Sequence, residues 1–181
     1  MFKISITIML LLLYSITVTA QEQNQTNTQN ESESFEKRWH ISGVISHTYI
    51  GSNGKGNQLF VPSWGLNIGY RLNHKLGIGL HSDIRADNFV VVRRNNNEEI
   101  ERKYPLVFTL DALYNISNSL VLTVGPGIEV EQNESFGLAR IGLEYEYEIG
   151  TDFYLMPTLF YDQRFDGYST TTIGLGLAFK L

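Results

Sequence analysis

The C-terminal segment 170–181, which reads TTTIGLGLAFKL, restricts how this chain can fold more than any other part of it. From Ile173 onward, large apolar residues alternate with small ones and with Lys180. A period of two indicates a β-strand with one apolar face. A soluble β-sandwich needs large residues on its inner face and charges outside, but this strand has no large apolar residue on its second face. The pattern therefore favours a strand whose apolar face meets lipid and whose other face lines a narrow polar interior.

The same alternation recurs in earlier segments that are long enough to cross a membrane as tilted strands. We predict strands at about 38–50, 59–72, 75–88, 104–116, 120–131, 136–149, 153–164 and 170–181. Single-chain bacterial membrane barrels have an even number of antiparallel strands. The sequence thus predicts an all-β fold, an eight-stranded antiparallel up-and-down transmembrane β-barrel that spans 38–181.

The connections between the predicted strands differ in length from one end of the barrel to the other. Short turns lie at 73–74, 117–119 and 150–152, whereas 51–58 and 89–103 are long. Short turns on one rim and long loops on the other are typical of the periplasmic and extracellular ends of outer-membrane barrels. An extracellular partner is expected to bind the loop 89–103, because long loops on a rigid scaffold often carry recognition.

Two local features refine this prediction. The valine run 90–92 suggests that the third strand continues above the membrane as a protruding hairpin, with an edge suited to β-addition.

Pro126 and Pro157 lie inside predicted strands, where a residue without an N–H interrupts the ladder. We expect a bulge or a local loss of pairing at each proline.

The N-terminal part of the chain predicts export. Segment 1–20 combines one cation, Lys3, with an apolar run and small residues before Gln21, as a secretory signal peptide does. Segment 21–37 is polar throughout and is predicted to be a disordered leader, because it cannot bury enough apolar surface to offset its ordering entropy.

Charge and cysteine content exclude several classes of protein. The formal net charge is −5, and removal of Lys3 makes it −6, which argues against a nucleic-acid partner. The absence of Cys excludes disulfides and a lipid-modified N-terminal cysteine. After residue 20 no apolar run reaches the length of a transmembrane helix, so any membrane crossing is expected to use strands.

Ionisable residues fall on the inward face of the predicted strands. Eight strands enclose a space that side chains can fill, and charges there must pair, bind water or shift their pKa values. We interpret these residues as a structural salt-bridge plug, with a gated ion path or a small-ligand site as the alternative. The predicted lumen charge network consists of Arg71, Asp83, Arg85, Asp111, Glu129, Arg140, Glu144, Glu146, Glu148, Asp162, Arg164 and Lys180.

Aromatic residues gather on the outward face near the rim of short turns. Tyr and Trp favour the membrane interface, where the ring is buried and its polar group stays hydrated. The predicted periplasmic aromatic girdle consists of Trp39, Tyr70, Tyr114, Tyr147, Phe153 and Phe179.

Catalysis and metal binding find little support. The triplet His81-Ser82-Asp83 has suitable residue types, but neighbours in a strand point to opposite faces, so His81 and Ser82 cannot readily share a proton. His40 and Ser42 share a face but lie near the predicted periplasmic rim. The histidines show no metal-ligand spacing. We predict no catalytic residue, cofactor or metal. A soluble lipocalin-like barrel that binds an apolar ligand is the second interpretation, and a lipid-modifying outer-membrane enzyme is the third.

Segment 38–181 resembles the small eight-stranded outer-membrane barrels of Gram-negative bacteria, the OmpA/OmpX-like and related "outer membrane protein β-barrel domain" families. The resemblance rests on the strand pattern and on the chain end, where Gly176, Phe179 and Leu181 match the C-terminal insertion signal of the family. The usual final aromatic residue is replaced by Leu181. The resemblance implies insertion by the barrel-assembly machinery into the outer membrane of a Gram-negative bacterium. It also implies contact with outer-membrane lipid, a monomeric state and a non-enzymatic structural or surface-interaction role.

Overall fold

The structure, a computed structural model, describes residues 39–51, 59–93, 98–132 and 134–181. The predicted signal peptide and polar leader lie outside these residues. Within the described ranges, no helix has the length and apolar character needed to cross a membrane.

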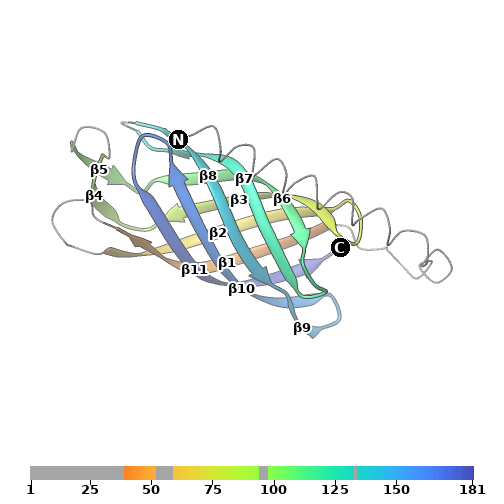
Figure 1. Ribbon diagram of the computed structural model, residues 1–181. Helices are drawn as coiled ribbons and strands as arrows, with labels where there is room; N and C mark the ends of the chain where they lie inside the picture. Colours follow the sequence, from red (N-terminus) through yellow and green to blue (C-terminus); the bar gives the residue numbers. More distant parts are fainter. Residues whose placement is uncertain (1–38, 52–58, 94–97, 133) are drawn as a thin grey trace, which may run out of the picture. The chain divides into compact units, whose positions relative to one another are not determined.

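β-strands make up most of the described chain. Their bounds are β1 (Trp39–Ile50), β2 (Leu59–Arg71), β3 (Leu76–Arg85), β4 (Asn88–Val92), β5 (Glu99–Lys103), β6 (Leu106–Asn115), β7 (Leu120–Val130), β8 (Phe136–Tyr145), β9 (Tyr147–Gly150), β10 (Phe153–Arg164) and β11 (Ser169–Lys180). All except β4 and β5 belong to one antiparallel sheet, in which neighbours in sequence are neighbours in space (Figure 1). β11 pairs with β10 on one side and with β1 on the other, which closes the sheet into a barrel. Because β9 continues β8, the barrel has eight strand positions, and the predicted fold is confirmed.

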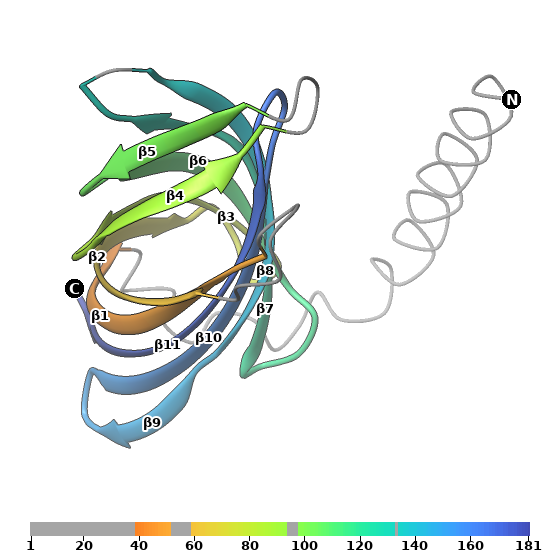
Figure 2. The same cartoon turned by 90° about the vertical axis from the view of Figure 1, so that its left-hand side faces the viewer.

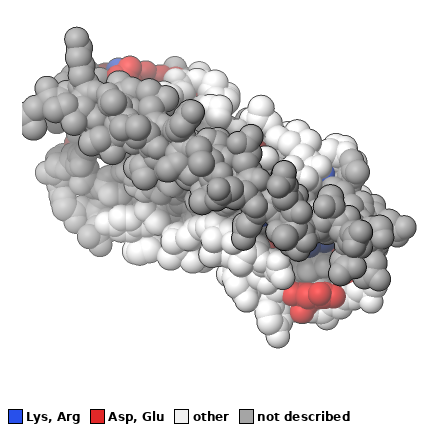
Figure 3. Space-filling model, turned by 45° about the vertical axis from the view of Figure 1, so that its right-hand side comes forward, with Lys and Arg blue, Asp and Glu red and all other residues white. Residues whose placement is uncertain are grey.

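The barrel exposes apolar residues and buries charged ones. On the outer wall Leu175 is 44% exposed and Ile68 is 38% exposed, whereas inside the barrel Glu144 is 2% exposed and Arg71 is 8% exposed. The wall visible in Figure 3 carries few charged side chains between its two ends. The alternation therefore runs in the predicted direction. A lipocalin-like barrel needs the reverse arrangement, so this polarity argues against that interpretation.

Both prolines coincide with a local loss of pairing, which is one of the two outcomes that the sequence predicts. The β6–β7 ladder lacks the rungs of Leu110 and Asp111, and Pro126 lies opposite Leu110 in this register. The partner of β10 changes from β9 to β8 opposite Pro157, where Glu146 separates the two strands. Proline has no N–H to donate, so a ladder cannot be completed at either position.

The turn between β9 and β10 extends beyond the neighbouring wall. β7 begins at Leu120, which pairs with Tyr145, and β9 pairs only with β10. Glu148 is exposed in this extension. The prediction that Glu148 belongs to the lumen is therefore wrong, because the strand continues past the point at which the barrel encloses an interior.

Strands β4 and β5 form a separate two-stranded sheet. In Figure 2 they cross the opening of the barrel at the end that carries the long loops. The apolar side of this hairpin packs into a buried cluster that consists of Ile50, Val61, Phe89, Val91 and Tyr168. The sequence instead predicted that the run 90–92 would prolong the third strand as a protruding hairpin. β3 ends at Arg85, and the hairpin that follows folds over the mouth, so we refer to β4 and β5 as the hairpin cap.

Candidate functional site in the lumen and at its mouth

The structure gathers most of the predicted lumen charge network inside the barrel. The buried members are Arg71, Asp83, Arg85, Asp111, Glu129, Arg140, Glu144, Glu146, Asp162 and Arg164. Lys180 is half-buried at the short-turn end, and Glu148 is the exposed exception. The buried charges are arranged in successive layers along the barrel.

The layer at the short-turn end is centred on Glu146. Arg71 donates to Glu146 and to the side-chain oxygen of Asn115. Lys180 Nζ lies 2.9 Å from Glu146 Oε2 and 3.7 Å from the centre of the Tyr154 ring. One carboxylate thus joins strands β2 and β11 across the end of the lumen.

The middle of the lumen holds a histidine between two carboxylates. His81 Nδ1 lies 2.6 Å from Asp111 Oδ2, and its Nε2 lies 3.4 Å from Glu144 Oε1. A carboxylate that orients a histidine is also one part of a nucleophile–base–acid triad. However, Ser82 lies on the other face of β3 and donates to the carbonyl of Leu66 at 2.7 Å. The triplet that the sequence singles out therefore does not assemble a nucleophile with its base.

Arg140 forms the next layer. Its Nε donates to Asp162 Oδ1 at 2.7 Å, and its Nη2 donates to Asp83 Oδ2 at 2.7 Å. The ring of Phe160 lies beneath the guanidinium, with 4.7 Å between Cζ and the ring centre. Two strands, β6 and β7, separate β3 from β8 in the sheet, so this side chain links distant parts of the wall.

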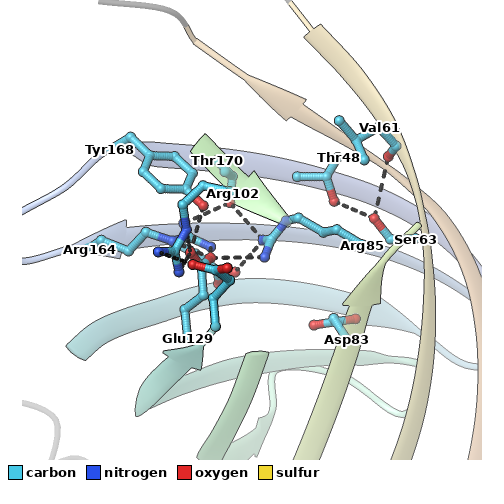
Figure 4. Close-up of polar contacts among 12 residues, drawn as sticks. Thr48, Val61, Ser63, Asp83, Arg85, Arg102, Glu129, Arg164, Tyr168 and Thr170 are labelled. Atoms are coloured by element: carbon cyan, nitrogen blue, oxygen red, sulfur yellow. Dashed lines mark hydrogen bonds and ion pairs between the residues drawn. The ribbon is translucent and has the colours of Figure 1, made fainter. Parts of the chain in front are cut away.

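The layer at the mouth converges on Glu129 (Figure 4). Its Oε2 accepts hydrogen bonds from Arg164 Nε at 2.7 Å and from Arg85 Nη1 at 3.1 Å. Its Oε1 accepts from the hydroxyl of Tyr168 at 2.7 Å and from Arg102 Nη2 at 2.8 Å. Burial raises the pKa of the Tyr168 hydroxyl to about 12, so this group is a donor at neutral pH. A single carboxylate therefore holds three guanidinium groups.

Arg102 and Tyr168 belong to the mouth layer, but the predicted lumen charge network does not include them. Arg102 belongs to the hairpin cap, within the loop 89–103 that the sequence predicts to bind an extracellular partner, yet it is fully buried. The available signal was weak: Arg102 shares one face of a short strand with the apolar Ile100. Tyr168 lies in the connection between β10 and β11, whose sequence gives no period.

The residues of the predicted aromatic girdle lie on the outer wall at the short-turn end. All are exposed except Tyr70, which is half-buried. The rings of Trp39 and Tyr70 are 4.8 Å apart between centres, and those of Phe153 and Phe179 are 4.9 Å apart. At the end of the chain, Phe179 and Leu181 are exposed whereas Gly176 is buried.

Metal binding gains no support from the described part of the chain. There, no group of three or more His, Cys, Asp or Glu side chains is arranged to hold an ion. The carboxylates of the lumen instead face arginines, lysine and histidine.

Comparison with known proteins identifies the fold. No protein-family model and no curated protein matches the chain. Among solved structures, the neisserial surface protein A (NspA) matches with a TM-score of 0.58 at 10% identity, over 79% of this chain and 97% of NspA. Ail, the attachment invasion locus protein of Yersinia pestis, matches with a TM-score of 0.54 at 15% identity, over 81% of this chain and 99% of Ail. The N-terminal barrel domain of Pseudomonas aeruginosa OprF matches with a TM-score of 0.50 at 17% identity, over 77% of this chain and 97% of that domain.

The closed sheet has the fold of the small eight-stranded outer-membrane β-barrels. Within that class the chain is similar in fold to NspA and Ail. Identities this low show a shared fold and do not show a shared role.

Proposed function

We propose that this chain is an integral outer-membrane β-barrel without catalytic activity, closed by a polar plug and active in surface interaction at its loop end. The observation that carries the proposal is the apolar outer wall around a charged interior. In water such a wall would be a large exposed apolar surface, which soluble monomers rarely have. Outer-membrane lipid supplies the surroundings that this wall requires.

Fractionation tests the location. Washing membranes with sodium carbonate should leave the protein in the membrane fraction, and detergent should extract it. An unboiled sample should migrate differently from a boiled one on a denaturing gel, because a closed barrel resists detergent until it is heated. Recovery from the soluble periplasmic fraction would contradict the proposal and favour the lipocalin-like alternative.

Assembly forms part of the same proposal. We infer that Gly176, Phe179 and Leu181 act as the insertion signal for the barrel-assembly machinery, that the aromatic girdle lies at the periplasmic interface and that the barrel is a monomer. Phe179→Ala should lower the amount of assembled, heat-modifiable barrel. Phe165→Ala, which removes a ring that is 71% exposed near the loop end, is the matched control. Equal yields of the two variants would argue against the insertion signal.

A lipid-modifying enzyme is the alternative that the geometry disfavours, because Ser82 and His81 point to opposite sides of the wall. Mass spectra of lipid A from cells with and without the protein decide the matter. We expect identical profiles, whereas a changed acylation pattern would establish an enzymatic activity.

The charge of the loop end favours a cationic partner. Ail has been crystallised with the heparin analogue sucrose octasulfate, an anionic ligand. In the part of the loop end that the structure describes, the exposed acidic residues are Asp87, Glu98, Glu99, Glu101 and Asp166. Lys103 is an exposed cation among them, and it lies 3.5 Å from Glu101. We expect the protein to bind polyarginine-coated beads at low salt and not to bind heparin-coated beads. The reverse result would argue for an anionic partner.

A further inference from the structure

The mouth of the barrel contains a fully formed site for a guanidinium group. Arg102 Nε and Nη2 donate to Glu129 Oε1 at 3.1 and 2.8 Å. Arg102 Nη1 donates to Glu131 Oε2 at 3.3 Å and to the backbone oxygen of Glu134 at 2.8 Å. The ring of Phe136 covers the guanidinium, with 4.8 Å from Cζ to the ring centre. Every nitrogen thus has an acceptor, and an aromatic ring lies within cation–π range.

The occupant and the walls of this site come from different elements. Its acceptors and its ring lie on β7, β8 and the connection between them, whereas Arg102 lies on the hairpin cap. The cap is a sheet of its own and forms no ladder with the barrel. Tyr104, which joins the cap to β6, has a φ of 46°, a conformation that is strained for a residue other than glycine. The Arg102 guanidinium therefore occupies a site on the barrel wall as a ligand occupies a receptor, although both belong to the same chain.

Removal of Arg102 would affect the acceptors of its guanidinium group to different degrees. Glu129 would keep Arg85, Arg164 and Tyr168, so its charge would remain compensated. The Glu131 carboxylate and the Glu134 carbonyl would lose the Arg102 donor, next to the face of Phe136. A planar fork of donors satisfies these acceptors better than a compact ammonium does.

We propose that this pocket binds a guanidinium group from outside the chain, and that Arg102 of the hairpin cap occupies it as an internal competitor. The proposal deepens the surface role and rests on the proposed function, since an external ligand must reach the loop end. Its test uses protein in detergent micelles, so it can fail without affecting the fractionation result.

Calorimetric binding of agmatine, compared with putrescine at equal ionic strength, tests the site. The two probes share a four-carbon amine, and only agmatine carries a guanidinium group. Arg102→Ala should bind agmatine about tenfold more tightly than the wild type does, because the intramolecular competitor is gone. It should also bind agmatine about tenfold more tightly than putrescine. Lys103→Ala removes an exposed cation from the same strand and should bind agmatine as the wild type does.

A second variant covers the case in which Arg102→Ala does not fold. Phe89 is buried against Tyr168, with 6.0 Å between ring centres, and lies opposite Arg102 in the cap, but it supplies none of the acceptors of the guanidinium site. Phe89→Ala should loosen the cap and so raise the affinity for agmatine above that of the wild type. Unchanged affinity in whichever variant folds, or equal binding of agmatine and putrescine, overturns the proposal and leaves Arg102 as a structural contact. Tighter binding of Gly-Arg-Gly than of agmatine would identify the source as an arginine side chain, and the reverse would identify a small guanidino compound.

Discussion

Tyr168 shows how a neutral residue can be as important as a charge inside the mouth layer. Its hydroxyl donates to Glu129 at 2.7 Å, and its ring lies 4.4 Å from Cζ of Arg164. Phe89 and Phe136 contact the same ring edge to face. One side chain thus links the ionic cluster to the apolar underside of the hairpin cap.

The stability contributed by the Tyr168 hydroxyl is expected to depend on pH. Its pKa rises from an ordinary value near 10 to about 12 in the folded protein, so folding favours the neutral form. This contribution is complete below pH 10 and is lost as the pH rises through about 12. Tyr168→Phe should lower the free energy of unfolding by about 1.5–3 kcal/mol below pH 10, since it removes a hydrogen bond to a charged group. The difference from the wild type should shrink toward pH 12.

Urea unfolding in micelles across this pH range provides the measurement. Tyr114→Phe, on the exposed outer wall, should change the unfolding free energy by no more than about 0.5 kcal/mol below pH 10. A gap between wild type and Tyr168→Phe that stays constant with pH would show that the hydroxyl is not held neutral by the fold.

At the scale of the strand, β6 and β7 approach each other closely at Gly125, beside Pro126. A Cβ atom added to Gly125 would collide with the backbone oxygen of Leu110 and with Asp111. A Cβ added to Gly43, on β1, would have no atom within 4 Å. Glycine at position 125 is therefore required by the spacing of two strands, whereas glycine at position 43 is not.

Gly125→Ala should destabilise the barrel by about 1–3 kcal/mol, because the added methyl must push the β6 backbone away. Gly43→Ala should be neutral or stabilising by up to about 1 kcal/mol, since it restricts the unfolded chain without a clash. The melting temperature of the heat-modifiable gel band compares the two variants. Equal melting temperatures would mean that the β6–β7 seam is looser than the structure has it.

Local pattern explains why the strands could be predicted and the cap could not. Alternation along β8 arises because each residue faces either the outer wall or the lumen. The sequence therefore shows on which side of the wall residues such as Leu143 and Glu144 lie. The run at Val90 lacks alternation, and Arg102 lies among exposed glutamates. Burial of Arg102 depends on acceptors 27 to 32 residues away, and no local pattern encodes a contact at that separation. The prediction that Glu148 faces the lumen was wrong because alternation continues along the strand beyond the point at which the barrel encloses an interior.

For the whole molecule, closure and polarity inversion depend on each other. A closed sheet has no free edge, so every strand finds a partner without an extension by another chain. The interior then becomes the only place for the charges that the inward faces carry, and the layers centred on Glu146, Arg140 and Glu129 pair them there. The outer wall is left with apolar side chains, whose surroundings we propose to be lipid.

Two isoleucines of equal exposure test whether lipid surrounds the assembled barrel. Ile141, in the middle of the wall on β8, is 51% exposed, and Ile149, near the short-turn rim on β9, is 52% exposed. In water an arginine at either position would be tolerated, because the side chain is already exposed. In a bilayer, Ile141→Arg should cost about 2–4 kcal/mol and Ile149→Arg only about 0–1 kcal/mol, since the penalty for a cation rises with depth. Reversible unfolding in lipid vesicles gives both values. Equal and small costs for the two substitutions would show that lipid does not surround the outer wall, and would contradict the proposed membrane location.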